Sequence, residues 1–383
     1  MWIQLVFFGF LAAISLSQAE KFVIQLERIS KLPETEPTNN TRYGGLGRLF
    51  DQYGQAVTNT QNIWYKGIIT VGTPPQPFNV MFDTGSDLLW IPARGCTSSG
   101  AAVSNCRAQN PVYTATSSST ARNTGQSFSI AYGLGSAQGT YYQDAFAFGS
   151  PNGRQLKYPQ AVTFGAAQQM TFFDGGIFGL SFPTSRNPNP IFYEGIRQRV
   201  FDQAMFTAYF ANCPSTGTCQ NGGTITLGGF DSQHCSPNYN WIPVVGNGPY
   251  WQFNFQGISA GSYSFNQAAS AITDTGKLRT SYVIGPQAQI QQLAAAIGAQ
   301  NRNGAYFANC NAQFTIYITI NGYRYPIQAS TLMIPLGGSS CQLALSSGNF
   351  GFWIFGAATI RNYCVVHDIQ NRRVAFAPVL SRG

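Results

Sequence analysis

The sequence contains few charged side chains. Only 9% of its 383 residues are Asp, Glu, Lys or Arg, whereas 44% are hydrophobic and 14% aromatic. A helical bundle or a coiled coil needs charged residues on its solvent faces, so this composition argues against both. It also argues against intrinsic disorder, because ample apolar surface offsets the entropy of the chain. Many Gly, Tyr, Phe, Ser and Thr residues instead favour an all-β protein of short strands and tight turns.

Histidine is even scarcer, since His234 and His367 are the only two in the chain. This excludes a histidine-rich zinc site and an HExxH metalloprotease. A Ser-His-Asp or Cys-His mechanism would need one of the two, and neither lies in a recognisable setting. His367 falls in a strand-like run, residues 364–368, where a structural role is expected. No CxxC spacing is present, and we predict neither a metal nor a cofactor.

Acidic residues are also in the minority. The chain has 14 acidic and 22 basic residues, which gives a formal net charge of +8. Such a charge first suggests a nucleic-acid partner. The basic residues are scattered, however, with Arg372-Arg373 the densest spot, and they form no basic helix or stripe. We therefore predict a positively charged surface without a nucleic-acid partner.

The N-terminal residues predict entry into the secretory pathway. Residues 5–14 form an apolar core, and residues 16–19 resemble a cleavage site, so we predict a signal peptide over residues 1–19. This core is too short to span a bilayer, and no later apolar run is long enough to do so. The sequence therefore predicts a secreted or endolysosomal protein without a transmembrane segment.

The next segment, residues 20–60, is polar and rich in turn-forming residues. Its acidic and basic residues balance, and it shows little periodicity after Phe22-Val23-Ile24. We interpret it as a removable pro-segment; the alternative is a flexible linker.

Eight cysteines in a secreted chain predict disulfides. Sequence alone leaves 105 pairings open. Proximity along the chain favours three short loops and leaves one long-range pair: Cys96–Cys106, Cys213–Cys219, Cys310–Cys341 and Cys235–Cys364.

From Trp64 onward the pattern is typical of β-structure, with short apolar or alternating runs separated by turn residues. The clearest expected strands are Gly67–Val71, Phe78–Phe82, Phe128–Tyr132, Thr224–Leu227, Phe314–Ile320 and Arg373–Phe376. One helix is expected over Gln287–Ile297.

Two features recur in the same order along the chain. An apolar run ends in Asp83-Thr84-Gly85 and is followed later by residues 176–180, Gly-Ile-Phe-Gly-Leu; a second ends in Asp274-Thr275-Gly276 and is followed by residues 353–356, Trp-Ile-Phe-Gly. The matched glycines lie 96 and 82 residues after their aspartates. Two copies of one unit, each with an Asp at a strand end, are what a symmetric two-lobed site requires.

Two such carboxylates, brought face to face, cannot both ionise easily and would share one proton. One can then act as a base toward a bound water while the other donates a proton to a carbonyl group. A single Asp-Thr-Gly is usually only a turn with a local hydrogen bond. Two of them within matched repeats favour catalysis.

At this point the sequence resembles the pepsin-like family of aspartic proteases, most closely its nematode members. The resemblance covers nearly the whole chain after the signal peptide. Its motifs are residues 69–76 (ITVGTPPQ), 82–92 (FDTGSDLLWIP), 132–136 (YGLGS), 227–231 (LGGFD), 250–253 (YWQF), and 354–356 (IFG) through 376–378 (FAP).

The resemblance implies an all-β, bilobal fold with two pseudo-symmetric β-barrel-like lobes and a few short helices. The lobes would span residues 61–232, with the first Asp-Thr-Gly and the flap, and residues 233–383, with the second. It also implies an aspartic endopeptidase made as a zymogen and active on peptides and proteins at acidic pH, without a cofactor. We expect a monomer.

Carried over residue by residue, the resemblance makes Asp83 and Asp274 the catalytic dyad. Thr84 and Thr275 would interlock the two loops beneath the carboxylates, and Ser86 would bond the outer oxygen of Asp83. Gly85 and Gly276 complete the two motifs.

The resemblance also implies a mobile flap that closes over the substrate. Tyr132, Gly133 and Leu134 would lie on it, and Trp90 would pack beneath and bond the hydroxyl of Tyr132. Family members commonly have Thr where Leu134 stands, so one side-chain hydrogen bond to substrate would be lost.

The main departure follows the second Asp-Thr-Gly. The family has Thr or Ser there, but here Lys277-Leu278-Arg279 intervenes before Thr280. The segment could be a gene-model artefact, a real loop that still lets Thr280 reach Asp274, or damage to the site, because a cation beside Asp274 favours its ionised form. The alternative function is thus a catalytically impaired homologue that binds peptides.

Overall fold

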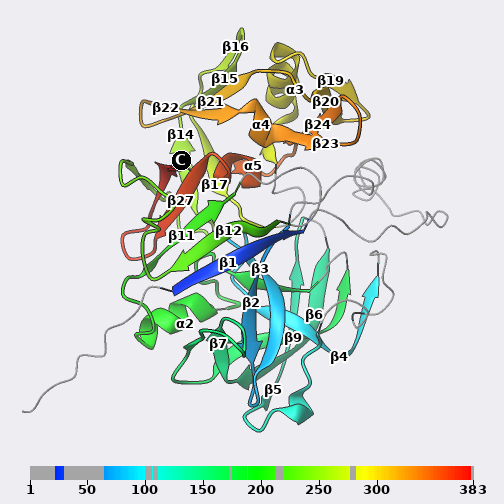
Figure 1. Ribbon diagram of the computed structural model, residues 1–383, viewed down its shortest axis with the longest axis vertical. Helices are drawn as coiled ribbons and strands as arrows, with labels where there is room; N and C mark the ends of the chain where they lie inside the picture. The colour runs from blue at the N-terminus through cyan, green and yellow to red at the C-terminus, as the bar shows by residue number, and fades with distance from the viewer. Residues whose placement is uncertain are drawn as a thin grey trace, which may run out of the picture.

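The computed structural model describes residues 22–29, 64–99, 106, 111–133, 135–171, 175–187, 189–211, 219–276 and 282–380. Most of these residues form β-strands, arranged in one long sheet and three small ones (Figure 1). None of the helices in these ranges has the length and apolar character needed to cross a membrane. The expected all-β class is confirmed.

The long sheet runs through the whole molecule and has fifteen strands. Its order is β13 (Trp241–Pro243), β28 (Arg373–Pro378), β27 (Tyr363–Asp368), β11 (Met205–Phe210), β12 (Cys219–Leu227), β1 (Phe22–Ile29), β2 (Trp64–Val71), β3 (Gln76–Asp83), β10 (Gly176–Gly179), β4 (Trp90–Ser99), β9 (Val162–Thr171), β6 (Ser136–Asp144) and β5 (Arg122–Ala131). Two short strands lie off this path, β7 (Phe146–Phe148) on β2 and β8 (Leu156–Lys157) on β7.

Three small sheets belong to the C-terminal part of the chain. The first is β14 (Gln252–Phe255), β17 (Ala269–Thr273), β26 (Trp353–Phe355), β18 (Val283–Gly285) and β25 (Leu345–Ser347). The second is β16 (Tyr263–Phe265), β15 (Gly257–Ala260), β21 (Thr315–Ile320) and β22 (Tyr323–Gln328). The third is β19 (Gln300–Arg302), β20 (Ala305–Asn309), β24 (Ser340–Leu343) and β23 (Met333–Pro335).

The helices are short: α2 (Ile191–Arg197), α3 (Gln287–Ala296), α4 (Ala329–Leu332), α5 (Ala357–Ile360) and the 3-10 turn η1 (Ala115–Ser117). The longest, α3, begins directly after Pro286 and buries Ile290, Leu293 and Ala294. Residues three and four apart share one helix face, so a single apolar stripe holds α3 against the strands. It lies where a helix is expected, and all six expected strands fall on observed strands apart from a residue or two at their ends.

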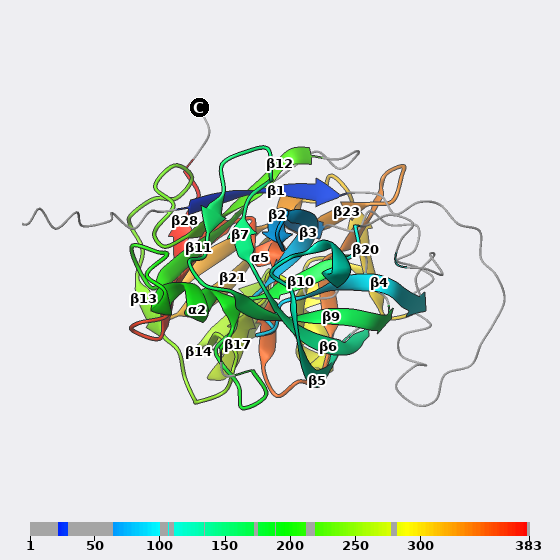
Figure 2. The same ribbon diagram turned by 90° about the horizontal axis from the view of Figure 1, so that it is seen from below.

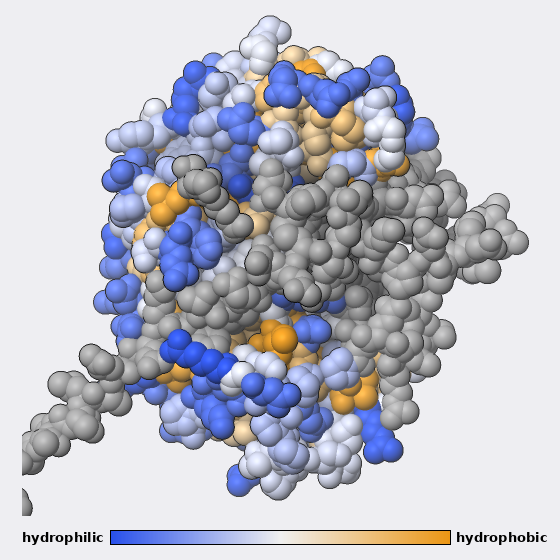
Figure 3. Space-filling model, in the orientation of Figure 1, coloured by the Kyte–Doolittle hydropathy of each residue, from blue (hydrophilic) through white to orange (hydrophobic). Residues whose placement is uncertain are grey.

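The middle of the molecule is spanned by β27, β11, β12 and β1, with the small sheets on one side and strands β2 to β9 on the other (Figure 1). β11 pairs with β27, so the two parts of the chain are joined by backbone hydrogen bonds. The strands on both sides carry a continuous buried core rich in Phe, Ile and Val. The described surface is largely hydrophilic with scattered apolar patches (Figure 3).

β1 is the one described piece of the segment predicted to be removable. It pairs antiparallel with β12 along most of its length and with β2 at its end. Figure 2 shows β1 beside both strands. The sequence interpretation of a polar segment did not predict a strand inside the long sheet. The predicted signal peptide, residues 1–19, lies outside the described residues.

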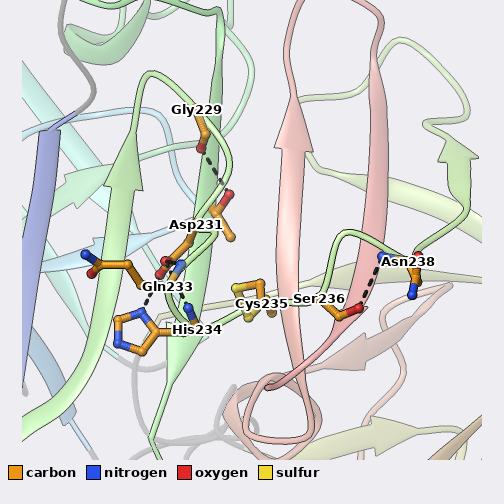
Figure 4. The surroundings of a disulfide bond; sticks show 9 residues. Gly229, Asp231, Gln233, His234, Cys235, Ser236 and Asn238 are labelled. Atoms are coloured by element: carbon orange, nitrogen blue, oxygen red, sulfur yellow. Dashed lines mark hydrogen bonds and ion pairs between the residues drawn. A yellow bond between two sulfur atoms is a disulfide. The ribbon is translucent and has the colours of Figure 1, made fainter. Parts of the chain in front are cut away.

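Three of the four expected disulfides are formed: Cys96–Cys106, Cys235–Cys364 and Cys310–Cys341. The fourth involves Cys213, which lies outside the described residues. The loop that carries Cys235 is shaped by Asp231, whose carboxylate accepts hydrogen bonds from the backbone of Gln233 and His234 at 3.0 and 3.2 Å. The His234 ring nitrogen Nδ1 lies 2.7 Å from the same carboxylate (Figure 4).

Candidate active site

The first Asp-Thr-Gly lies at the end of β3, which pairs with β2 on one side and β10 on the other. β10 pairs in parallel with β3 so that Gly179 lies opposite Asp83. The backbone N–H of Leu180 donates to the carbonyl of Asp83 at 2.8 Å. A side chain at Gly179 would overlap the backbone of residues 86–88, so the glycine lets the two chains approach closely. The chain therefore leaves β3 in a tight loop with the Asp83 carboxyl buried.

The second Asp-Thr-Gly is built in the same way. β26 pairs in parallel with β17, with Phe355 opposite Thr273. The N–H of Asp274 donates to the carbonyl of Phe355 at 3.3 Å. In each loop the glycine N–H binds its own aspartate: Gly85 donates to Asp83 Oδ1 at 2.9 Å, and Gly276 donates to Asp274 Oδ1 at 2.8 Å. The repeat found in the sequence is thus a repeat of local geometry.

The two loops hold each other by reciprocal threonine contacts. Thr84 Oγ1 donates to the carbonyl of Thr273 at 2.9 Å, and Thr275 Oγ1 donates to the carbonyl of Phe82 at 2.7 Å. Each hydroxyl also accepts the other threonine's N–H, at 3.1 and 3.0 Å. All four contacts are buried, so each loop is positioned by the other.

This arrangement brings the two carboxyls face to face. A Cβ placed on Gly85 would lie 3.0 Å from Asp274 Oδ2, and one placed on Gly276 would overlap Asp83 Oδ1. Each glycine therefore packs against the aspartate of the opposite loop. Only glycine leaves room for this contact.

The electrostatics favour one shared proton. Burial raises the pKa of Asp83, and hydrogen bonds from Ser86, Gly85 and Asp274 oppose the shift. Desolvation disfavours the charged carboxylate, and the charge of Asp87 adds to this effect. Ser86 Oγ donates a short hydrogen bond to Asp83 Oδ2. The pair can therefore hold one proton while the other carboxylate stays ionised.

Tyr132 lies at the hairpin between β5 and β6, close to the first aspartate. Trp90 Nε1 donates to the Tyr132 hydroxyl at 2.8 Å. Burial, together with the charge of Asp83, raises the pKa of Tyr132, whereas hydrogen bonds with Trp90 and Ser86 oppose this. Ser86 thus stands between the tyrosine and Asp83. Gly133 is exposed at the hairpin, and Leu134 lies outside the described residues.

The sequence analysis did not single out Asp87, a third buried acid in the same loop. Thr184 Oγ1 donates to its carboxylate at 2.6 Å, and Asn187 Nδ2 donates to its backbone carbonyl at 2.7 Å. Burial raises its pKa. Its charge also adds to the raised pKa of Asp83. The sequence did hold a signal for Asp87: it is a carboxyl side chain in the mostly apolar segment that follows Asp83-Thr84-Gly85.

Tyr250 is a second residue that the sequence analysis left without a role. Burial raises its pKa, and the charges of Asp274 and Asp83 add to the shift, which places Tyr250 in the field of the pair. Its ring lies 5.6 Å from that of Phe352, which lies 6.4 Å from the 48% exposed ring of Phe350. These three rings form an aromatic cluster near the two aspartates, contributed by the C-terminal part of the chain.

The segment that departs from the family, Lys277–Arg279, lies outside the described residues. Among the described residues, no group of three or more His, Cys, Asp or Glu side chains could hold a metal ion. The site offers two buried carboxyls with hydroxyl donors around them, and two such carboxyls can share one proton. Such a pair can activate water and protonate a carbonyl oxygen in one site.

Comparisons with known proteins agree with this geometry. The sequence model of the eukaryotic aspartyl protease family matches residues 64–379. Aspartic protease 6 of Caenorhabditis elegans is 35% identical over 344 residues, which cover 86% of this chain and 85% of the relative. Cathepsin E of Aquarana catesbeiana is 34% identical, with 85% and 82% covered. Pepsin A of Suncus murinus is 35% identical, with 85% and 83% covered.

Proposed function

The chain belongs to the eukaryotic aspartyl protease family, and from this premise we propose that it hydrolyses peptide bonds in proteins at acidic pH through Asp83 and Asp274. The observation that carries the proposal is the reciprocal packing of the two Asp-Thr-Gly loops. Four buried threonine contacts and two close-packed glycines hold both carboxyls in one place. No cofactor is required.

In the proposed reaction the ionised carboxylate removes a proton from a water molecule, which attacks the scissile carbonyl carbon. The other carboxyl donates its proton to the carbonyl oxygen, giving a tetrahedral diol. The carboxyl that took the water proton then gives it to the leaving nitrogen as the C–N bond breaks, and the other carboxylate takes a proton from one diol hydroxyl, which restores the carbonyl group and the starting state of the pair. The hydrogen bond from Ser86 orients Asp83, and burial keeps the shared proton on the pair at acidic pH.

The substrate is proposed to be an extended peptide with bulky apolar side chains at the cut. Tyr132, whose pKa responds to Asp83, and the ring pair Tyr250–Phe352, whose tyrosine responds to both aspartates, support this apolar preference. Tyr132 is proposed to close over the bound peptide.

We further propose the zymogen organisation expected from the sequence: a signal peptide over 1–19, a pro-segment over 20–60, and lobes over 61–232 and 233–383. The pairing of β1 with β2 and β12 supports a pro-segment folded onto the enzyme. Lys31, Arg42 or Arg48 would pair with the dyad at neutral pH, and acid would release it by protonating carboxylates. The mature enzyme is proposed to be a secreted or endolysosomal monomer.

The test is cleavage of a denatured protein by acid-activated enzyme, with and without pepstatin. Asp83→Asn and Asp274→Asn should each lower kcat by about a thousandfold, within the usual range for removing an acid–base group. Asp202→Asn removes an exposed aspartate and should leave the rate unchanged. Equal rates in all four proteins would reject the catalytic pair.

The rival function is a catalytically impaired, peptide-binding homologue, because of Lys277-Leu278-Arg279. It predicts pepstatin binding by the purified protein without cleavage at any pH. If the segment impairs catalysis, its deletion should raise acid protease activity; an unchanged or lower rate would reject that effect.

A further inference from the structure

His367 is a buried histidine on β27 of the long sheet. It lies on β27 opposite Phe206 of β11 and is fully shielded from solvent. The Phe206 ring stacks on the imidazole at 4.3 Å, and the Trp251 ring meets it edge-on at 4.8 Å. The imidazole thus packs against two aromatic side chains.

The polar partner of this ring is Thr273, the residue directly before Asp274. Thr273 Oγ1 lies 3.0 Å from His367 Nε2, in a buried contact between residues 94 apart in sequence. The carbonyl of Thr273 accepts the hydrogen bond from Thr84 Oγ1. Thr273 therefore links two contacts: its side chain contacts His367, and its backbone carbonyl contacts Thr84 of the first loop.

The equivalent residue in the first repeat is held differently. Phe82 precedes Asp83, and its carbonyl accepts the hydrogen bond from Thr275 Oγ1. Its side chain packs on Phe178 and Phe148, with ring centres 5.1 and 6.4 Å away. The side chain before the first aspartate is thus held by aromatic packing, and the side chain before the second by a hydrogen bond to an imidazole.

The strand that carries His367, β27, is itself held on both sides. It pairs with β28 along its whole length and with β11 over four residues. Its Cys364, three residues before His367, forms the disulfide with Cys235. β17, which pairs with β14 and β26, ends at Thr273, so a hydrogen bond from β27 can add to the contacts that hold this strand end.

We propose that His367 is a positioning residue for catalysis: its imidazole holds Thr273 and thereby sets the position of the Asp274 loop against Asp83. This role rests on the proposed function, since it concerns the same carboxyl pair. His367 itself contacts neither water nor substrate in the reaction.

Kinetics of four variants test the proposal. His367→Phe keeps a flat ring but removes the hydrogen bond, and Thr273→Val removes the other partner while keeping the backbone carbonyl. Each should lower kcat by about tenfold with KM within about twofold, since small misplacements of catalytic groups cost rate rather than binding. His367→Gln places an amide near Nε2 and should restore most of kcat. The double variant, His367→Phe with Thr273→Val, should lose a smaller factor in kcat than the product of the two single-variant factors, because both substitutions remove the same contact.

The result that overturns the proposal is a kcat for His367→Phe equal to that of the wild type, or single losses that multiply in the double variant. A general loss of folding would lower the amount of active enzyme in His367→Phe and His367→Gln alike, so active-site titration with pepstatin sets the concentration. If His367→Phe does not fold, the kcat of Thr273→Val is compared with that of the wild type instead, and equal values overturn the proposal.

Hydrogen exchange separates this inference from the proposed function. A peptide covering Ala269–Gly276 should exchange about tenfold faster in His367→Phe than in the wild type, while β5 should exchange at the same rate. This result is expected even if the wild type cleaves no substrate, in which case the proposed function fails and the positioning contact stands. Equal exchange in both regions would reject the positioning contact, whatever the activity.

Discussion

Replacing His367 with glutamine should make the stability of the protein less dependent on pH across the acidic range. Burial lowers the pKa of His367 to about 3, from an ordinary value of 6.5. The ring is surrounded by Phe206, Trp251 and backbone, with little to stabilise a charged imidazolium. Glutamine keeps a hydrogen-bonding group near Thr273 and does not titrate.

The size of the effect follows from proton linkage. Between pH 6.5 and 3 the unfolded chain binds a proton at this histidine that the folded protein does not, so stability falls as pH falls through this window. Each pH unit is worth about 1.4 kcal/mol, and a change from pH 7.5 to 4.5 costs about 3 kcal/mol at this one site. The scarcity of carboxylates limits the ion pairs that acid can break, but His367 works in the opposite direction.

The assay is urea unfolding at pH 7.5 and 4.5, followed by tryptophan fluorescence. Both proteins carry Asp83→Asn to prevent self-digestion, so the contribution of the remaining groups cancels in the comparison. Between pH 7.5 and pH 4.5, the protein with His367 should lose about 3 kcal/mol more unfolding free energy than the protein with His367→Gln.

Phe206→Leu is the matched control, because it loosens the same ring stack without removing a titrating group. It should lower the free energy of unfolding equally at both pH values. The reasoning is refuted if the wild type and His367→Gln show the same pH dependence, whatever their absolute stabilities.

Asp87→Asn should move the alkaline limb of the kcat/KM profile to lower pH, because removing a nearby negative charge lowers the pKa of Asp83; an unmoved limb would contradict this. Replacing Cys235 and Cys364 together by Ser should cost about 2–5 kcal/mol of unfolding free energy, measured in urea without reductant, since the disulfide closes a loop of 129 residues. The buried carboxylate of Asp144 accepts hydrogen bonds from the hydroxyls of Tyr113, Ser118 and Thr120 at 2.7, 3.1 and 2.5 Å. Asp144→Ala leaves these donors without their acceptor and should cost about 3 kcal/mol or more; a thermal midpoint within a degree or two of the wild type would count against it.

Much of the fold was predictable because it depends on local patterns. Apolar runs bounded by turn residues marked the strands, and the helix expected over Gln287–Ile297 is α3, which buries Ile290, Leu293 and Ala294. The pairing of the two aspartates was predictable from the repeat, since a duplicated strand end implies a symmetric partner. Their hydrogen-bond partners Gly85 and Gly276 lie two residues away.

The remaining features depend on contacts between distant residues. Thr273 and His367 are 94 residues apart, and nothing in either local sequence indicates the contact. The sequence near His367 predicted only a strand. β1 was missed because its apolar residues open an otherwise polar segment, and nothing local shows that it pairs with β2 and β12.

The order in which the ribosome makes the chain has a consequence for when proteolysis can begin. β27 follows both aspartates in the chain, yet β11 pairs with β27 and Thr273 bonds His367. A nascent chain that already displays both aspartates still lacks this strand of the long sheet and the His367 contact. The contact proposed to position the second loop can therefore form only after β27 has left the ribosome. The order of synthesis thus makes this contact a late step in assembling the proposed site.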